Sequence, residues 1–304
     1  MCGIVAVTGY KKALPLLLNG LEKPEYRGYD SAGIAIIDSE TKNIACNKTE
    51  GKLKNLINNI NDKKILGTVG IGHTRWATHG KPEVKNAHPH TDSSGNVAVV
   101  QNGIIENYKD LKNKLEKEGI IFNSDTDTEV IPHLIQRELN TLSKLKLENN
   151  GSTLLVAVRN VISDLEGSYA LAVLWSGAPT SLVIARRQAP LIIGLGEGEF
   201  ICASDTPAIA NFTNIILPLE DEEIALLTPL GIEIYDSNNE RQYRNPVSLK
   251  VSEQVIDKKN FKHFMLKEIY DQPETAKNWL KNYLIKNPDN GQFHINYPFD
   301  TNFF

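Results

Sequence analysis

The residue with the clearest chemical potential is Cys2, which stands directly behind the initiator Met1. If Met1 is removed, Cys2 carries both a thiol and a free α-amine. The reference pKa of such an amine, about 7.7 to 8.0, lets it accept a proton near neutral pH. Nucleophile and base would then share one residue, an arrangement open only to a chain terminus. The alternative is an inert cysteine that packs as a small hydrophobe on a first buried strand.

Other polar groups follow apolar runs that are typical of buried strands. The run at 68–72 leads into a polar and aromatic segment at 73–80, and the run at 97–100 ends in Gln101-Asn102-Gly103, which is typical of a turn. The acidic segment Ser124 to Glu129 precedes apolar residues at helical spacing, so we expect a helix N-terminus there. Capping accounts for one or two of these six residues. A further carboxylate such as Asp127 could instead receive a ligand's ammonium group.

Two further groups of residues have simpler interpretations. Arg27 lies in a loop with several glycines, where a salt bridge is favoured over a substrate contact. His79, His88 and His90 lack zinc spacing and have no cysteine or carboxylate to complete a ligand set, so no metal site is predicted.

Composition limits the class of protein. With 304 residues, 41% of them hydrophobic and 23% charged, the chain is typical of globular proteins and long enough for one large domain or for one domain with an appendage. A net charge of -4 and scattered lysines give no basic surface for nucleic acid, and no apolar run is long enough to cross a membrane. Of the three cysteines, Cys46 and Cys202 lie in apolar stretches and are expected in the core. An odd number of cysteines without a signal peptide indicates the cytoplasm.

The order of predicted elements indicates a layered α+β domain. Strands and amphipathic helices alternate up to a helix over 153–165, and a meander of strands follows between 169 and 235. Short turns between consecutive strands favour antiparallel pairing, with helices covering the faces of the sheets. We expect one domain over residues 1–236, a polar linker over 237–262, and a helix at 263–284 within a final segment, 263–304.

Six segments in order resemble the glutamine:fructose-6-phosphate aminotransferase family, over about residues 1 to 280. They are Met1 to Val5, Tyr26 to Gly33, Gly72 to Gly80, Asn102 to Tyr108, Ser124 to Glu129 and His263 to Glu268. The resemblance implies a four-layer αββα fold of the N-terminal-nucleophile hydrolase type. It also implies a glutaminase reaction that yields L-glutamate and ammonia from L-glutamine without a cofactor.

The resemblance also assigns roles to residues. It implies that Cys2 is the nucleophile with its own α-amine as base, and that the Asn102 side chain and the Gly103 backbone N–H form the oxyanion hole. The segment that holds the substrate's α-carboxylate matches Arg75, Thr78 and His79, and the acceptor of the α-ammonium matches Asp127. Trp76 resembles a tryptophan that gates the passage from the glutaminase site to an ammonia channel, and Arg27 is a further candidate for substrate binding. A zwitterionic amino acid needs a fixed cation and a fixed anion, which Arg75 and Asp127 would supply.

Some features depart from the family pattern. Gln101 stands where histidine is usual, and Gln188-Ala189-Pro190 replaces Gly-Ser-Pro. The family's two sugar-isomerase domains, which bind fructose 6-phosphate, are not in this sequence, so we expect the chain to be cut short or an incomplete gene product that hydrolyses glutamine without forming an amino sugar. The full-length family enzyme is expected to be a homo-oligomer. Two alternatives are an amidase with another substrate and a non-catalytic assembly module.

Overall fold

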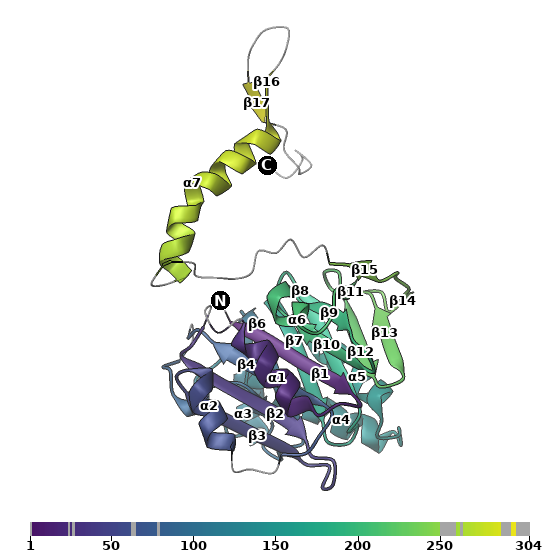
Figure 1. The fold of residues 1–304 in the computed structure, drawn as a ribbon. Helices are drawn as coiled ribbons and strands as arrows, with labels where there is room; N and C mark the ends of the chain where they lie inside the picture. Colours follow the sequence, from purple (N-terminus) through teal and green to yellow (C-terminus); the bar gives the residue numbers. More distant parts are fainter. Residues whose placement is uncertain are drawn as a thin grey trace. The chain divides into compact units, whose positions relative to one another are not determined.

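The computed structural model describes residues 2–23, 25, 28–61, 65–77, 80–249, 260–261, 264–286 and 293–295. The chain divides into two compact units, Met1–Ser252 and Glu253–Phe304. The first unit contains two antiparallel sheets and the helices that cover them (Figure 1). This is the predicted α+β class.

The first sheet has eight strands in the order β15-β11-β9-β10-β1-β4-β2-β3. Its strands are β1 (Gly3–Gly9), β2 (Ser31–Ile37), β3 (Ile44–Glu50), β4 (Gly70–Arg75), β9 (Ile192–Leu195), β10 (Glu199–Ala203), β11 (Ile215–Pro218) and β15 (Val247–Ser248). The N-terminal strand β1 is central, pairing antiparallel with β4 on one side and β10 on the other. The strand that follows Cys2 is therefore paired with a neighbouring strand on each of its two edges.

The second sheet has seven strands in the order β14-β13-β12-β8-β7-β6-β5. They are β5 (His90–Thr91), β6 (Val97–Ile105), β7 (Gly167–Trp175), β8 (Leu182–Arg187), β12 (Ile224–Thr228), β13 (Gly231–Tyr235) and β14 (Arg241–Gln242). Strand β5 is so short that it pairs with β6 only at Val99 and Ala98. Most of β6 therefore has one edge that pairs with no strand of the described segments.

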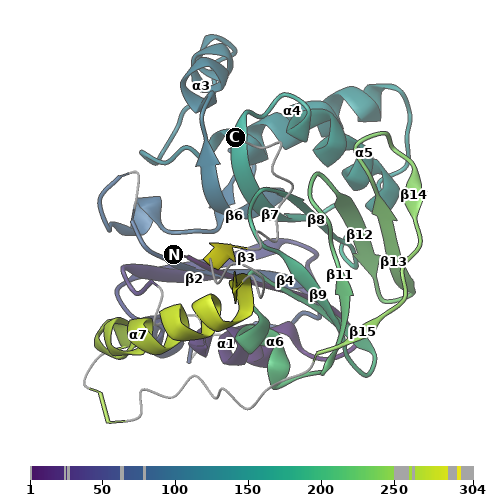
Figure 2. The same ribbon diagram turned by 90° about the horizontal axis from the view of Figure 1, so that it is seen from above.

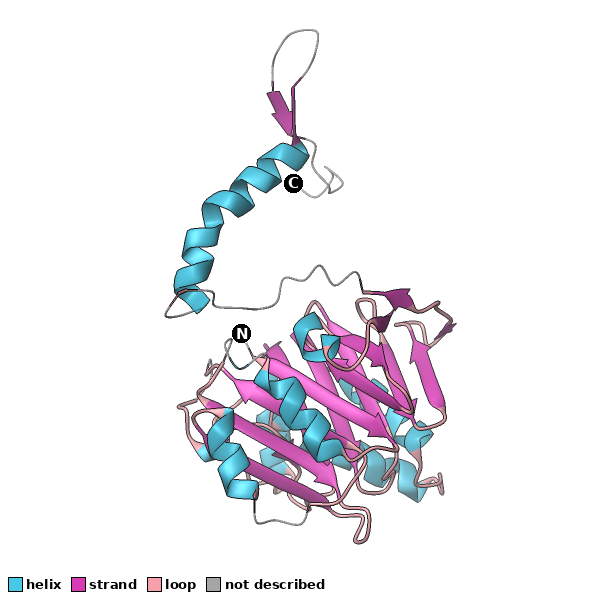
Figure 3. Ribbon diagram, in the orientation of Figure 1, coloured by secondary structure: helices cyan, strands magenta, loops and turns pink. Residues whose placement is uncertain are grey.

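Helices cover the outer faces of both sheets. The first sheet packs against α1 (Ala13–Glu22), α2 (Leu53–Ile60) and α6 (Thr206–Ala210), and the second against α4 (Val130–Lys144) and α5 (Gly151–Ile162), with α3 (Tyr108–Lys117) beside α4 and a 3-10 turn, η2 (Val84–Asn86), before β5. Figure 2 shows α1 and α6 on one side of the two sheets and α4 and α5 on the other, and Figure 3 separates the same elements by type. The predicted four-layer αββα arrangement is confirmed.

Side-chain alternation explains this sandwich, because successive residues of a strand point to opposite faces. On β1, Ile4 and Ala6 pack between the sheets, while Val5 and Val7 pack against the helices. Both sets are fully buried, which is why the strand reads as an unbroken apolar run. Three apolar layers thus separate the four structural layers.

Several local predictions were wrong. The strand at 68–72 continues as β4 through Arg75, and the expected turn at Gln101 to Gly103 is the middle of β6. Cys46 is exposed on the edge strand β3, although Cys202 is fully buried as expected. The local pattern did not predict that the strands continue through these polar residues. Polar side chains can be buried in a strand when distant segments supply their hydrogen-bond partners, and a local pattern does not show such partners.

Residues 237–249, assigned above to a linker, include β14 and β15 of the two sheets, so the first unit extends past Asp236. In the second unit the predicted helix is α7 (Phe264–Tyr283), followed by a hairpin of β16 (Leu284–Lys286) and β17 (Phe293–Ile295). No helix among the described residues is long and apolar enough to cross a membrane.

The packing of α1 on the first sheet generates a stability prediction. Leu17 is fully buried in the apolar layer between this helix and the sheet. We expect Leu17→Ala to lower the free energy of unfolding by about 2 to 5 kcal/mol, because it removes buried methyl groups and leaves a cavity. Denaturant unfolding measures the loss. Leu230→Ala, at a side chain that is 93% exposed, is the control and should change stability by less than about 0.5 kcal/mol.

Candidate functional site

The candidate site lies where the apolar layer between the two sheets turns polar. Ile71 of β4 and Val100 of β6 both pack in that layer. Since residues two apart share a face of a strand, His73 continues the inner face of β4 and Asn102 continues that of β6. Cys2 precedes Ile4 by the same spacing. Alternation thus brings three polar residues from distant parts of the chain to one end of the sandwich.

The Cys2 thiol is held by the backbone of Trp76. The Trp76 N–H donates to Cys2 Sγ at 3.3 Å, and Sγ lies 3.5 Å from the Trp76 carbonyl oxygen. Burial raises the pKa of the Cys2 thiol, while the Trp76 N–H and the Arg75 guanidinium act in the opposite direction. The thiol is therefore protonated at neutral pH and needs a base to become a nucleophile.

Asn102 connects the two sheets at Cys2. Its Nδ2 donates to the Cys2 carbonyl oxygen at 3.1 Å, and its Oδ1 lies 3.0 Å from Nε2 of His73. Asn102 is half-buried and Gly103 is exposed, so this pair borders the surface of the unit.

The backbone N–H of Gly103 points to the uncovered edge of β6. The N–H groups of Gln101 and Ile105 both leave the sheet, donating to Nδ1 of His88 at 3.2 Å and to Oδ2 of Asp127 at 2.8 Å. Because N–H directions alternate along a strand, the Gly103 N–H lies on the same edge, between these two. Only glycine fits, since φ is +114° and a Cβ would lie 2.1 Å from the Ser168 carbonyl oxygen.

Arg75 is a buried cation at the end of β4. Only 4% of the residue is exposed, and its guanidinium donates to the carbonyl oxygens of Lys81 at 3.3 Å and Gly80 at 3.4 Å. Burial lowers the pKa of Arg75, and the nearby Cys2, Asp30 and Asp127 oppose that effect. The same guanidinium thus acts electrostatically on both the thiol and two carboxylates.

Asp127 is a buried acceptor. It is 5% exposed, and its bond to the Ile105 N–H ties the segment before α4 to β6. Glu129 binds the backbone N–H groups of Asn123 and Ser124, at 2.8 and 2.6 Å. Helix α4 begins at Val130 without a side-chain cap from Glu129, so this acidic segment is a folded turn held by several carboxylates.

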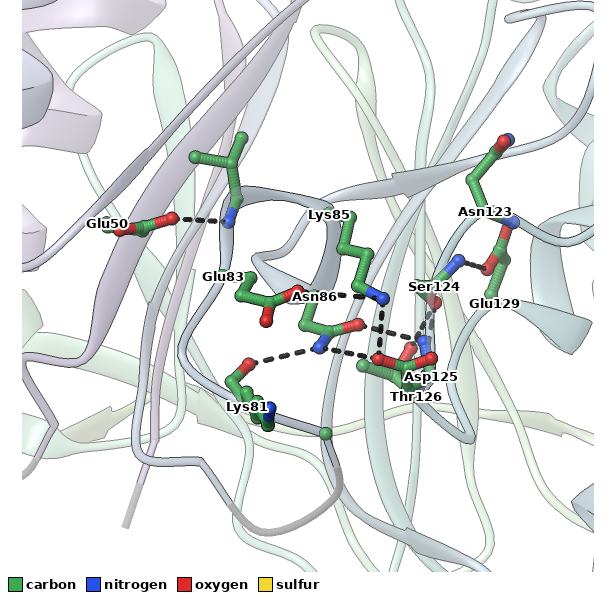
Figure 4. Close-up of polar contacts among 12 residues, drawn as sticks. Glu50, Lys81, Glu83, Lys85, Asn86, Asn123, Ser124, Asp125, Thr126 and Glu129 are labelled. Carbon is green, nitrogen blue, oxygen red and sulfur yellow. Dashed lines mark hydrogen bonds and ion pairs between the residues drawn. The ribbon is translucent and has the colours of Figure 1, made fainter.

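A cluster of polar contacts joins the segment 81–86 to the acidic turn at 123–129 (Figure 4). Asn86 donates to the Lys81 carbonyl oxygen and to Asp125, and its own Oδ1 accepts from the Asp125 N–H at 2.8 Å. Lys85 pairs with Asp125 at 2.9 Å. Since Arg75 binds the carbonyl of Lys81, the cluster connects the Arg75 side of the site to the segment that carries Asp127.

The remaining predicted site residues are placed only in part. Trp76 is 41% exposed and packs edge to face on Tyr29, with ring centroids 6.0 Å apart. Arg27, Thr78 and His79 lie outside the described residues. The structure therefore brings together Cys2, Arg75, Trp76, Asn102 and Gly103, with Asp127 close enough to act on Arg75.

The sequence analysis missed two groups that the structure adds. Asp30 accepts the Ala77 N–H at 2.8 Å, and its own N–H binds the Arg75 carbonyl oxygen at 3.0 Å. His73, His88 and His90 are buried together behind Asn102. The position of Asp30 within the segment Tyr26 to Gly33 was the available signal for it. Of these histidines, His88 and His90 had been weighed only as metal ligands, and His73 had been given no role.

The described part of the site is recognised by its polar contacts rather than by a metal cluster. Among the described residues, no group of three or more His, Cys, Asp or Glu side chains is arranged to hold a metal ion. Two cavities of about 420 Å³ each lie beside α3 and α4, and their lining includes none of Cys2, Arg75 and Asn102. The site is defined by its polar contacts.

Comparison with known proteins points to one class. The model of a glutamine amidotransferase domain matches residues 73–211. Among curated proteins, the glutamine–fructose-6-phosphate aminotransferase of Thermosynechococcus vestitus is 52% identical over 284 residues, 93% of this chain and 44% of the relative. The corresponding protein of Nostoc sp. is 51% identical with the same coverage. The chain thus spans less than half the length of these relatives.

A solved structure has the same fold. Glutamine phosphoribosylpyrophosphate amidotransferase from B. subtilis superposes with a TM-score of 0.64 and 28% sequence identity, over 80% of this chain and 50% of that protein.

The environment of the thiol generates a prediction on its reactivity. We expect the pH midpoint of Cys2 alkylation by iodoacetamide to lie above that of a cysteine in an unstructured peptide, because burial raises the pKa of the thiol. Arg75→Gln should move the midpoint higher, since it removes a cation that favours the thiolate. Peptide mapping by mass spectrometry resolves Cys2 from Cys46, with buried Cys202 as the unreactive control. A midpoint below that of the peptide would contradict this electrostatic picture.

Proposed function

Because the chain belongs to the glutamine amidotransferases, we propose that it hydrolyses the side-chain amide of L-glutamine to L-glutamate and ammonia with Cys2 as nucleophile. The observation that carries the proposal is the convergence of a thiol, an amide donor and a strand-edge N–H at Cys2, Asn102 and Gly103. These are the parts that acyl transfer requires, namely a nucleophile and donors for the developing oxyanion.

The reaction begins with activation of the thiol. Once Met1 is removed, the α-amine of Cys2 accepts the proton of Sγ, and the sulfur attacks the amide carbon of glutamine. The protonated amine then gives this proton to the leaving nitrogen, so that the C–N bond breaks and ammonia departs from a thioester on Cys2. Water, deprotonated by the same amine, hydrolyses the thioester and restores the thiol. The raised pKa of Cys2 makes this base necessary.

Asn102 and Gly103 stabilise the tetrahedral intermediates. The Asn102 amide is already turned with its NH₂ toward the Cys2 backbone, and the Gly103 N–H lies on the free edge of β6 beside it. Two donors fixed before the reaction stabilise the oxyanion without reorganisation.

Binding of the substrate's α-groups is proposed for the charged residues. Arg75 receives the α-carboxylate and Asp127 the α-ammonium, with Thr78, His79 and Arg27 as further contacts and Trp76 covering the site. Their electrostatic proximity supports this assignment, because one amino acid presents both charges on a single carbon.

The transfer of ammonia to an acceptor sugar is proposed only for a protein of the relatives' full length. The curated relatives are named for fructose 6-phosphate, and the chain matches 44% of their length. We propose that ammonia passes to fructose 6-phosphate bound by further domains of such a protein, giving glucosamine 6-phosphate. A homo-oligomer in the cytoplasm is proposed in the same way.

The central test is ammonia release from glutamine, asparagine and simple amides by wild type and Cys2→Ala. We expect glutamine to be the preferred substrate and Cys2→Ala to lose at least about 99% of the activity, as losses of a nucleophile do. Circular dichroism checks that the variant is folded, and Cys46→Ser is the matched thiol control. Retained activity in Cys2→Ala would refute the proposal, and a preference for another amide would replace glutamine as substrate.

Asn102 and Asp127 should differ in kinetic effect. We expect Asn102→Ala to lower kcat by about 100-fold with little change in KM, because its donor is needed only as charge develops. Asp127→Asn should raise KM and relax discrimination against glutamine analogues that lack the α-amine. Steady-state kinetics on both variants separates these effects. A raised KM with normal kcat in Asn102→Ala, or normal selectivity in Asp127→Asn, would contradict the assigned role.

A further inference from the structure

Three histidines are buried against one another directly behind Asn102. We call His73, His88 and His90 the histidine stack. The rings of His73 and His88 are nearly parallel, 15° apart with centroids 4.2 Å apart, and His90 packs edge on against His88 at 4.8 Å. None of the three is more than 5% exposed. The proposed reaction, as described so far, uses none of them.

Burial keeps these rings neutral. It lowers the pKa of His73 to about 4 and that of His90 to about 3, and it holds the pKa of His88 well below the ordinary value. A neutral imidazole has one N–H donor and one acceptor nitrogen. The direction of each hydrogen bond in the histidine stack is therefore a matter of tautomer.

The tautomer of His73 follows from its neighbours. The Cys2 carbonyl oxygen can only accept, so the Asn102 atom that lies 3.1 Å from it must be the NH₂ nitrogen. The other end of the amide, Oδ1, then faces His73 Nε2 at 3.0 Å. Since Oδ1 is an acceptor, His73 must carry its hydrogen on Nε2.

The His88 ring is fixed by the same reasoning. Its Nδ1 accepts from the Gln101 N–H at 3.2 Å, so its hydrogen is on Nε2, which faces Thr128 Oγ1 at 3.5 Å. The Thr128 hydroxyl in turn donates to Gln101 Oε1 at 2.7 Å. Held at both nitrogens, His88 is a rigid plane against which the His73 ring lies.

We propose that His73 is a positioning residue that fixes the orientation of the Asn102 amide, and so the polarity of the oxyanion hole. This inference rests on the proposed function. The Nε2–H of His73 keeps Asn102 Oδ1 turned away from Cys2. One hydrogen of the Asn102 NH₂ binds the Cys2 carbonyl, and the second is directed to the substrate oxyanion. With the other His73 tautomer, the lone pair of Nε2 would face Oδ1 and repel it, so the Cys2 carbonyl alone would hold the amide and its NH₂ would be less firmly directed to the oxyanion.

Variants of His73 test the proposal through Asn102. We expect His73→Phe, which keeps a planar ring against His88 but has no donor, to lower kcat by about 10-fold or more and to change KM by less than about 3-fold. His73→Gln, whose amide can donate from a similar position, should recover most of kcat. His133→Phe is the control, because His133 is equally buried but outside the histidine stack, and its kcat should stay within about 2-fold of wild type.

A double-mutant cycle separates positioning from a general structural effect. In the Asn102→Ala background, His73→Phe should cause almost no further loss of kcat, since residues that act through one group are not additive. An equal loss of kcat in both backgrounds would overturn the proposal, as would an unchanged kcat in the single variant. Cys2 alkylation, which forms no oxyanion, should proceed at the wild-type rate in His73→Phe.

The tautomer can be measured in the wild-type protein itself, with a variant needed only to assign the signal. In ¹⁵N-histidine-labelled wild-type protein, long-range ¹H–¹⁵N correlations at pH 7 should show His73 as the neutral Nε2–H form, assigned by its absence in His73→Gln. An Nδ1–H tautomer would overturn the proposal whether or not His73→Phe folds. This result is independent of catalysis: wild-type protein that releases no ammonia would refute the proposed function, whereas active protein with the Nδ1–H form would refute only the role of His73.

Discussion

The constraint on which this structure depends is that polar groups placed between two packed sheets must satisfy one another. Water is excluded there, and a buried donor or acceptor without a partner costs about 1 to 3 kcal/mol. Asn102 meets the requirement from the second sheet by joining the carbonyl of Cys2, directly before β1, to His73 of β4. The contacts that close the sandwich at this end are therefore the same contacts that orient the candidate catalytic groups.

The fold was largely predictable, because runs of apolar residues and short turns identify buried antiparallel strands locally. The ends of the strands that carry the candidate site could not be predicted in this way. His73 to Arg75 and Gln101 to Gly103 interrupt their apolar runs, and the partners of their side chains are distant in sequence: His73 contacts Asn102 across the sheets, and Gln101 binds Thr128. Likewise, Cys46 is exposed because β3 is an edge strand, and strand order is a global property.

The site was predicted residue by residue from family resemblance, and the structure adds the contacts between those residues. Gln101 illustrates the difference. The sequence showed it only as a departure from the family pattern, whereas in the structure its N–H binds His88 and its side chain binds Thr128, next to Asp127. Gln101 thus joins the strand of the proposed oxyanion hole to the segment of the proposed ammonium acceptor. No spacing rule could show this, because His88, Gln101 and Thr128 come from three separate segments of the chain.

The charge of the site also bears on which substrate fits. Arg75 is almost fully buried, and the carboxylates of Asp30 and Asp127 are near enough to favour its charged form. A ligand that pairs with only one of the two opposite charges, Arg75 or Asp127, would desolvate the other without giving it a partner, at a cost of several kcal/mol. An amino acid zwitterion adds one charge of each sign and leaves the total unchanged, so only desolvation opposes its binding. Under the proposed assignment of Arg75 and Asp127 to the two α-groups, the site would favour glutamine over a simple amide, which has neither charge.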